Sequence, residues 1–385
     1  MVSVAGIELP VRPGRAEDPR VPGPEAELVL TPTTREHLRL LAQAIAWGRR
    51  PPLLEGETGV GKSALVRYLA YLTHTPVYWV NLCEQTDPSE LIGKYVPVGR
   101  DEFAWVDGVL IRAMKEGAWI FLDDINLAPS QILERINPLL DEDAFVIVTE
   151  HEGEKVIPQP GFRLFAARNP LHYRGRQRLS LAFVNKFNLI HIREHPPEEM
   201  EQILAEKGLE PEVARAMVEL LLQVRKLSQG KPSRLGGYRF GLRDLLRFRD
   251  YLVAYRDAFG LGPAFAKGAM YVFWDRLETW ELREEFLKVL GQVGPVSKEH
   301  LEKAVRERRC IYEIEPGIKG LFRELAWGVD HWALRTAEML LGSREDWPRL
   351  LGLRAAARIR LIAETLGPGI AEELVGLLEG IHVAC

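Results

Sequence analysis

The pattern of hydrophobic and polar positions divides the chain into two parts near residue 195. Before that point, short runs of apolar, aromatic and β-branched residues alternate with longer stretches in which apolar residues recur every three or four positions. Such runs are typical of buried strands and such spacing is typical of helices, so the alternation predicts an α/β fold: a parallel sheet with helices on both faces. The expected strands are residues 53–55, 77–82, 119–123, 162–168 and 187–192.

After His195 the strand pattern stops, and helical spacing continues to the end of the chain. This predicts a second, all-helical domain over residues 196–280 and a helical extension over residues 281–385, in which we find no chemical motif. The first 27 residues contain five prolines and show no clear periodicity, so we expect an extended arm at 1–27. The α/β domain then covers residues 28–195.

Composition narrows the class of protein. The chain has 385 residues, of which 46% are hydrophobic and 27% charged, as in ordinary folded proteins, and this excludes bulk disorder. The net charge of −4 and the lack of a like-charge block give no indication of nucleic acid or membrane as a partner. Three cysteines without metal-ligand spacing, no signal-peptide pattern and no long apolar run favour a cytoplasmic location.

The strongest motif is the sequence Gly-Glu-Thr-Gly-Val-Gly-Lys-Ser, which follows an expected strand and opens an expected helix. Glycines allow the backbone to turn its N–H groups toward phosphate oxygens, and the helix N-terminus adds a partial positive charge. The alternative is a chance match in a glycine-rich loop, which the flanking strand and helix disfavour. The residues expected to bind a nucleotide are Gly56, Glu57, Thr58, Gly59, Val60, Gly61, Lys62 and Ser63.

A second motif is the apolar strand at 119–123, which ends in the paired acids Asp123 and Asp124. In a P-loop protein, Asp123 would hold Mg²⁺ together with Ser63, and Asp124 would orient and activate the attacking water. By itself, the same pattern would fit a strand that ends in a solvated acidic turn.

The third candidate is Asn169, which ends the strand at 162–168 and precedes a proline. Its side chain can lie between the paired acids and the terminal phosphate and help to position water. The alternative is an asparagine that merely forms a turn before proline. The chain contains only six asparagines, so an asparagine beside a motif is less easily explained by chance.

With these motifs in place, the chain resembles AAA+ ATPases, and within them the dynein-related group that includes midasin and the MoxR-type bacterial ATPases. The resemblance covers about residues 28–260. It implies that residues 196–280 form a lid and that segments 94–106 and 144–160 are inserts that face a pore or a partner. The strings that carry the resemblance are residues 81–87, 91–93, 105–108, 122–128, 139–141, 162–166 and 169–170.

The resemblance also assigns residues outside the three motifs. Arg243 matches the sensor 2 arginine, which reaches from the lid to the γ-phosphate; otherwise it is one of several surface arginines of a helix. Lys186 stands where the group has an arginine finger for the neighbouring subunit, and Arg176 is the substitute that we favour, unless it only solvates a loop. Asp124 stands where the group usually has glutamate. Both departures raise the question of how fast this chain hydrolyses ATP.

The resemblance implies an ATP- and Mg²⁺-dependent remodelling ATPase that assembles as a homo-oligomeric ring and acts on a protein. A protein with a von Willebrand A domain is the first partner to seek. The altered Asp124 and Lys186 keep open an alternative, a nucleotide-dependent assembly module with little turnover. A GTP-using restriction motor of the same superfamily is less supported, because the sequence shows no DNA-reading module.

Overall fold

The computed structural model describes residues 1–312, except for residues 13, 16, 100–101, 171–178 and 230–238. The chain separates into two compact units, Met1–Ala304 and Val305–Cys385. Because the described residues end at 312, most of the expected C-terminal extension, residues 281–385, lies outside them. The first unit contains all the described residues up to Ala304, and with them every motif of the nucleotide site.

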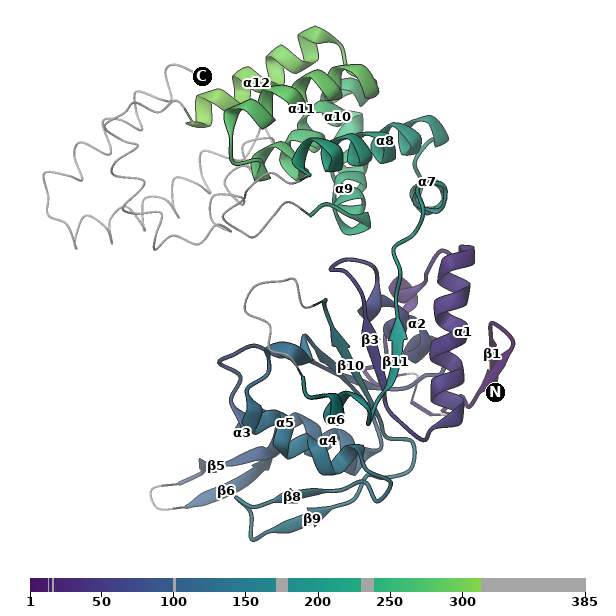
Figure 1. Ribbon diagram of the computed structural model, residues 1–385, viewed down its shortest axis with the longest axis vertical. Coiled ribbons are helices and arrows are strands. Elements are labelled where there is room, and N and C mark those ends of the chain that lie inside the picture. The colour runs from purple at the N-terminus through teal and green to yellow at the C-terminus, as the bar shows by residue number, and fades with distance from the viewer. Residues whose placement is uncertain (13, 16, 100–101, 171–178, 230–238, 313–385) are drawn as a thin grey trace, which may run out of the picture. The chain divides into compact units, whose positions relative to one another are not determined.

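The first unit is built around a five-stranded parallel sheet in the order β11-β3-β10-β7-β4 (Figure 1). The predicted parallel sheet is thus confirmed, and every expected strand lies within one residue of its observed bounds. The order places the strands that carry the three motifs next to one another in the centre of the sheet. The strands are β3 (Pro52–Glu55), β4 (Val77–Asn81), β7 (Trp119–Asp123), β10 (Arg163–Arg168) and β11 (Asn188–His191).

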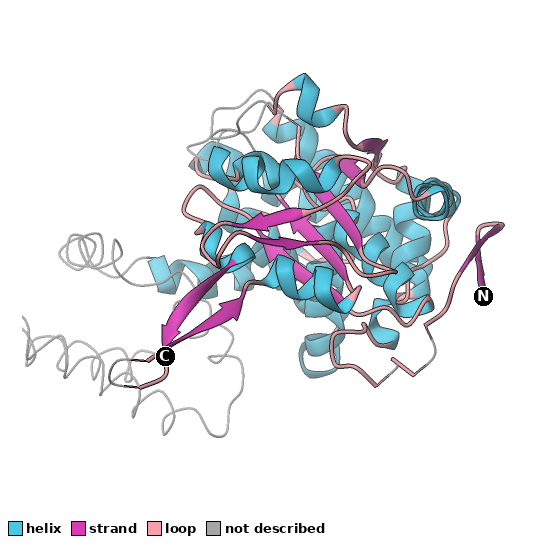
Figure 2. Cartoon of the chain, turned by 90° about the horizontal axis from the view of Figure 1, so that it is seen from below, coloured by secondary structure: helices cyan, strands magenta, loops and turns pink. Residues whose placement is uncertain are grey.

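Helices cover both faces of this sheet, as Figure 2 shows from below. Strand β7 is buried on both faces, and this explains why its sequence is a continuous apolar run. Trp119 and Phe121 pack into the core on one face, and Ile120 and Leu122 pack into the core on the other. Burying one such side chain stabilises the fold by about 1.5–3 kcal/mol. The helices are α1 (Pro32–Trp47) and α2 (Lys62–Leu72) on the first face, and α3 (Pro88–Ile92), α4 (Val109–Glu116), α5 (Ser130–Ile136) and α6 (Leu181–Val184) on the second.

The N-terminal residues differ from the expected extended arm. Strands β1 (Val2–Val4) and β2 (Ile7–Leu9) form an antiparallel hairpin, closed by Ala5 and Gly6, both with positive φ. Val4 and Leu9 are buried and belong to the core that includes α1. Three-residue strands are too short to produce a visible period, which is why the sequence pattern does not reveal the hairpin.

Both segments that the resemblance identified as inserts contain hairpins. The first pairs β5 (Gly93–Pro97) with β6 (Phe103–Asp107), and the second pairs β8 (Val146–Val148) with β9 (Glu154–Val156). They meet at His151, whose ring stacks on Trp105 with centroids 4.9 Å apart and whose Nδ1 lies 3.1 Å from the Tyr95 hydroxyl.

Among the described residues after 195, up to Tyr312, the regular elements are all helices, as expected. Their core is rich in aromatic side chains, among them Phe248, Phe265, Phe273 and Phe286. No helix of the described chain is both long enough and apolar enough to cross a bilayer. The helices are α7 (Pro197–Glu206), α8 (Pro211–Ser228), α9 (Leu242–Phe259), α10 (Leu261–Val272), α11 (Trp280–Val293) and α12 (Lys298–Tyr312). Short 3₁₀ helices span Pro24–Ala26, Ile125–Leu127, Asn137–Leu140 and Trp274–Arg276.

A buried polar cluster joins the start of α1 to the linker between β11 and α7. The N–H and the hydroxyl of Thr33 both donate to the Glu199 carboxylate, the hydroxyl at 2.9 Å. The Thr34 hydroxyl lies 3.0 Å from His195 Nε2, and the Arg193 N–H donates to His37 Nε2 at 3.2 Å. These bonds fix the direction in which the chain leaves the sheet.

This cluster predicts a loss of stability in mild acid. Burial, helped by the neighbouring His195, lowers the pKa of His37 from 6.5 to about 4. The unfolded chain therefore takes up a proton below pH 6.5 that the folded chain does not bind until about pH 4, so stability is complete above pH 6.5 and falls as the pH drops through this window. We expect a loss of about 1–2 kcal/mol between pH 7 and pH 5, measured by urea unfolding. His37→Gln, which keeps an acceptor for Arg193, should flatten this part of the profile; an unchanged profile would contradict the assignment.

Candidate functional site

The loop between β3 and α2 has the backbone form that the glycine motif requires. Gly59 and Gly61 have φ values of +88° and +96°, a conformation that side chains rarely adopt, and Gly61 directly precedes the first turn of α2. A Cβ on Gly56 would collide with the backbone carbonyl of Ile192. At each of these three positions, a steric or conformational reason thus requires glycine. The loop directs the N-terminus of α2 at the space above the sheet.

Lys62 is held in place by three oxygens. Its Nζ donates to the backbone carbonyls of Gly56 at 2.7 Å and Glu57 at 3.0 Å, and to Asn169 Oδ1 at 2.6 Å. The residue is 7% exposed, so its charge is largely removed from water and depends on these acceptors. This arrangement fixes a positive charge inside the curve of the loop.

Asn169 connects this charge to the acids at the end of β7. Its Nδ2 donates to Asp124 Oδ1 at 2.7 Å, while its Oδ1 accepts from Lys62. Because an ammonium only donates and a carboxylate only accepts, the two partners determine the orientation of the amide. The side chain of Asn126, which is buried, donates to the backbone oxygen of Asn169 at 3.2 Å and helps to hold it.

The paired acids differ in their surroundings. Asp124 has φ of +53° and ψ of +42°, and its carboxylate is turned toward Asn169. Asp123 accepts the N–H of Asp124 at 3.0 Å. Burial and the charge of Asp124 raise the pKa of Asp123, and Lys62 and Arg243 oppose that rise. A cation beside Asp123 would relieve the repulsion between the two acids.

The residues present fit a magnesium ion that is bound together with a nucleotide. The Ser63 hydroxyl and the Asp123 carboxylate are hard oxygen donors, which Mg²⁺ prefers, and two donors leave room for phosphate oxygens and water. The described residues contain no cluster of three or more His, Cys, Asp or Glu side chains that could hold a metal ion alone.

The helical region contributes two arginines beside the loop. A Cβ on Gly59 would lie 3.1 Å from the Cβ of Arg243, which places the predicted sensor residue against the glycine loop, in agreement with its effect on the pKa of Asp123. Arg239 donates to Glu57 Oε2 at 2.6 Å. This ion pair between the loop and the residues before α9 was not anticipated from the sequence. Its only sequence signal was an acid inside the glycine motif and a base four residues before Arg243.

Of the two predicted arginine-finger candidates, only Lys186 lies among the described residues, and it is not part of this site. Lys186 Nζ pairs with Asp141 Oδ1 at 2.6 Å, and it precedes the amino end of β11, whereas the loop lies at the carboxyl ends of the parallel strands. The contacts of Lys186 with Asp141 and Asn137 are structural, and its expected role toward a neighbouring subunit remains a prediction. Arg176 lies outside the described residues.

The packing of Gly59 yields a stability prediction. In Gly59→Ala, a side chain would have to adopt a positive φ and also push against Arg243, so we expect a destabilisation of about 1–2 kcal/mol from the backbone and a further loss from the contact. Gly153→Ala is the matched control, because Gly153 has φ of +72° but open space around it. The measurement is urea unfolding of both variants. Equal losses would show that Arg243 does not press on the loop.

Comparison with known proteins agrees with this geometry. Residues 51–187 match the family model described as AAA domain (dynein-related subfamily). The chain is 34% identical to midasin of Dictyostelium discoideum over 238 residues and 30% identical to midasin of Giardia intestinalis over 383 residues, or 61% and 94% of this chain.

These matches cover only 4% and 8% of the two midasins, so the chain spans less than a tenth of their length. It is also 31% identical to protein NorQ of Paracoccus denitrificans over 206 residues, which cover 52% of this chain and 76% of NorQ. Together with the parallel sheet and the loop–lysine–asparagine site, these similarities show that the chain belongs to the dynein-related AAA domain family and is homologous to midasin and to NorQ, a MoxR-type ATPase.

Proposed function

We propose that this protein binds Mg-ATP, hydrolyses it and uses the cycle to remodel or activate a protein partner from within a ring of identical subunits. The observation that carries the proposal is the chain of contacts from Lys62 through Asn169 to Asp124. It joins a phosphate-binding cation to a candidate base through one amide, at the edge of the sheet where ligands of parallel α/β folds bind.

Each residue has a distinct task in this proposal. The loop residues 56–61 and the start of α2 bind the phosphates, Lys62 neutralises the β- and γ-phosphates, and Ser63 and Asp123 hold the metal ion. Magnesium would supply charge neutralisation at the phosphates. Asp124 orients and deprotonates water, and Asn169 positions Asp124. Arg243 approaches from the lid and contacts the γ-phosphate, so that the helical region responds to the bound nucleotide.

The ring is proposed because the resemblance implies a finger supplied by a neighbouring subunit, and Lys186, the finger candidate among the described residues, is not part of the site of its own chain. Lys186 could serve a neighbour's nucleotide only after leaving Asp141, and it lacks the planar donor fork of arginine. Arg176 therefore remains our preferred finger. The inserts with the hairpins β5–β6 and β8–β9 would face the pore or the partner, for which a protein with a von Willebrand A domain is our first candidate. The cytoplasmic location inferred from the sequence belongs to the same proposal.

A second function is favoured by two observations: the Asp124 side chain is short and tied to Asn169, and Lys186 is engaged within its own chain. An assembly module that binds ATP and rarely hydrolyses it would need the intact phosphate loop but neither of these residues. Affinity for ATP and steady-state turnover, measured together, separate the two functions. Tight binding with turnover no higher than that of Lys62→Ala would support the assembly module.

The length of the Asp124 side chain gives a direct test. A glutamate places the carboxylate about 1.5 Å farther out, nearer the position that the resemblance implies, so Asp124→Glu should increase steady-state ATP turnover by up to roughly 100-fold. Asp124→Asn, which has the same length but cannot accept a proton, is the control and should abolish turnover. If turnover is unchanged or falls in Asp124→Glu, Asp124 is not the base.

Removal of the Lys62 charge tests whether nucleotide controls assembly. Lys62→Ala should weaken ATP binding by on the order of 100-fold, because it deletes the charge nearest to the phosphates, and should abolish ATP-dependent assembly in sedimentation velocity. Lys226→Ala removes an exposed lysine near the end of α8 and should change neither. Rings that form equally well in Lys62→Ala would argue against nucleotide at the subunit interface.

A further inference from the structure

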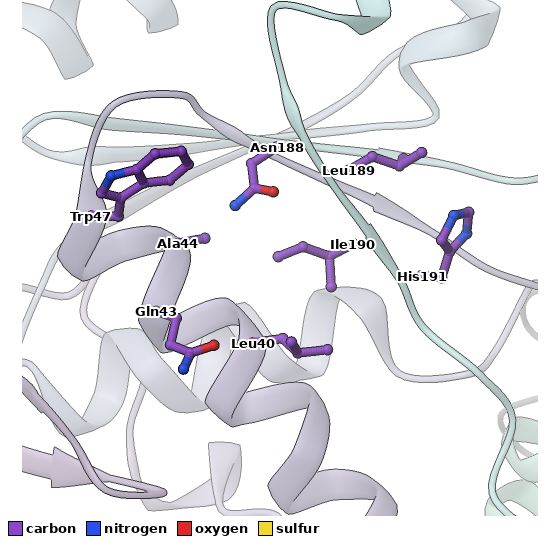
Figure 3. Close-up of a pocket in the computed structure, with 8 residues that line it drawn as sticks. All are labelled: Leu40, Gln43, Ala44, Trp47, Asn188, Leu189, Ile190 and His191. Atoms are coloured by element: carbon purple, nitrogen blue, oxygen red, sulfur yellow. The ribbon is translucent and has the colours of Figure 1, made fainter.

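A groove runs between α1 and the edge strand β11. It has a volume of about 540 Å³ and is lined by four residues of α1 and all four residues of β11 (Figure 3). Leu40, Ala44 and Trp47 form the wall on the helix side, and Ile190 projects from the strand toward them. The nucleotide site uses none of these residues.

Within the described residues, strand β11 pairs with another strand along one of its two edges only. It is the last strand of the sheet, and its bonds to β3 come from alternate residues: the Asn188 N–H donates to Pro51 and the Ile192 N–H to Glu55. The main-chain groups of Leu189 and His191 therefore point away from the sheet. Among the described residues, no strand pairs with this side of β11.

Strand β11 has only four residues, but it lacks the other common protections of an edge strand. Exposed edge strands commonly carry lysine, proline or a bulge that blocks a further strand, but β11 reads Asn-Leu-Ile-His. Two large apolar side chains are exposed beside it, Trp47 at 58% and Leu189 at 36%. The edge thus offers both the hydrogen bonds and the apolar surface that an added strand requires.

Three arginines lie within three residues of the lining residues Leu40 and Trp47 in the sequence, and the exposed Glu36 of the same helix is paired with Arg193. Arg39, Arg49 and Arg50 are all exposed, and in the described part of the chain no carboxylate forms an ion pair with them. Arg39 donates to Gln43, Arg49 lies over the Trp47 ring, and Arg50 donates to the carbonyl of Asn185 at 2.9 Å. In a chain with a net charge of −4, such a row selects an acidic ligand.

We propose that this groove binds an extended, acidic segment of a partner protein, which adds to β11 as a sixth strand. The N–H and C=O groups of Leu189 and His191 would pair with its main chain, and every second side chain would be apolar and pack against Leu40, Ala44 and Trp47. Acidic residues of the segment would meet the three arginines. This surface goes beyond the proposed ATPase function.

The groove lies at one edge of the sheet, and a partner bound there does not cover the other edge. Strand β4 forms the other edge, four strand spacings or roughly 19 Å away. A partner bound at β11 therefore does not compete with contacts at β4. In this proposal the groove tethers a partner at the β11 edge of the sheet.

The test uses the full-length protein and a defined probe, a capped seven-residue peptide of alternating glutamate and valine. At saturating peptide, amide hydrogen exchange at Leu189 and His191 should slow at least about tenfold. Exchange at Ile190, whose N–H already points toward β3, should not change. A peptide with lysine in place of glutamate should bind at least about tenfold more weakly. Failure of the glutamate peptide to bind at about 1 mM, or equal binding of both peptides, would overturn the proposal.

Variants separate strand addition from unspecific adhesion. Leu189→Pro removes one outward N–H and leaves the bonds of β11 to β3 intact, so it should weaken binding by about five- to tenfold more than Leu189→Ala does. Trp47→Ala and the double variant Arg39→Glu/Arg49→Glu should each weaken binding, and unchanged unfolding curves would show that these variants are folded. Binding that is insensitive to Leu189→Pro would exclude strand addition.

Other occupants give a different result without peptide. Protection of Leu189 that rises with protein concentration would show that a second copy covers the groove. Protection that is independent of concentration would show that another part of the same chain covers it. Either result would overturn the assignment to a partner protein.

Discussion

The nucleotide site depends on the burial of one positive charge, the ammonium group of Lys62. Removing an ammonium from water costs several kcal/mol unless acceptors surround it. Two of its acceptors are carbonyls of the loop, which can point inward only because of the turn that the glycines permit. The third is Asn169, which is available only because β10 lies beside β3. The loop conformation, the strand order and the orientation of the asparagine amide are therefore linked through one side chain.

The same linkage extends to the helical region through separate contacts. Arg239 and Arg243 reach the loop from the segment at the start of α9, and the bonds from Thr33 to Glu199 tie α1 to the first turn of α7. The loop thus has protein contacts both below it, in the sheet, and beside it, in the helices. A change in charge at the loop acts directly on Arg239, because its partner Glu57 belongs to the phosphate-binding motif.

The sequence predicted the features that depend on a short motif or on a regular pattern of apolar residues. Buried parallel strands produce continuous apolar runs, so all five strands could be located. The sequence also placed Asn169 beside the paired acids, where its amide contacts Asp124, whereas its expected role in positioning water remains a prediction. The sequence did not reveal the N-terminal hairpin, whose strands have three residues each, or the pairs Glu57–Arg239 and Lys186–Asp141. Such ion pairs join exposed charges that are distant in sequence, and no period or composition marks them. The assignment of Arg176 and the boundaries of the domains remain predictions.

The left-handed backbone of Asp124 has a consequence for how this position can vary. Aspartate and asparagine tolerate that conformation better than longer or β-branched side chains do, because their short polar groups can bond locally. A side chain that reached farther toward the phosphate would therefore be held by a less favourable backbone, at a cost of about 1 kcal/mol. The backbone at this position thus favours aspartate, whereas the proposed hydrolysis would favour a longer carboxylate.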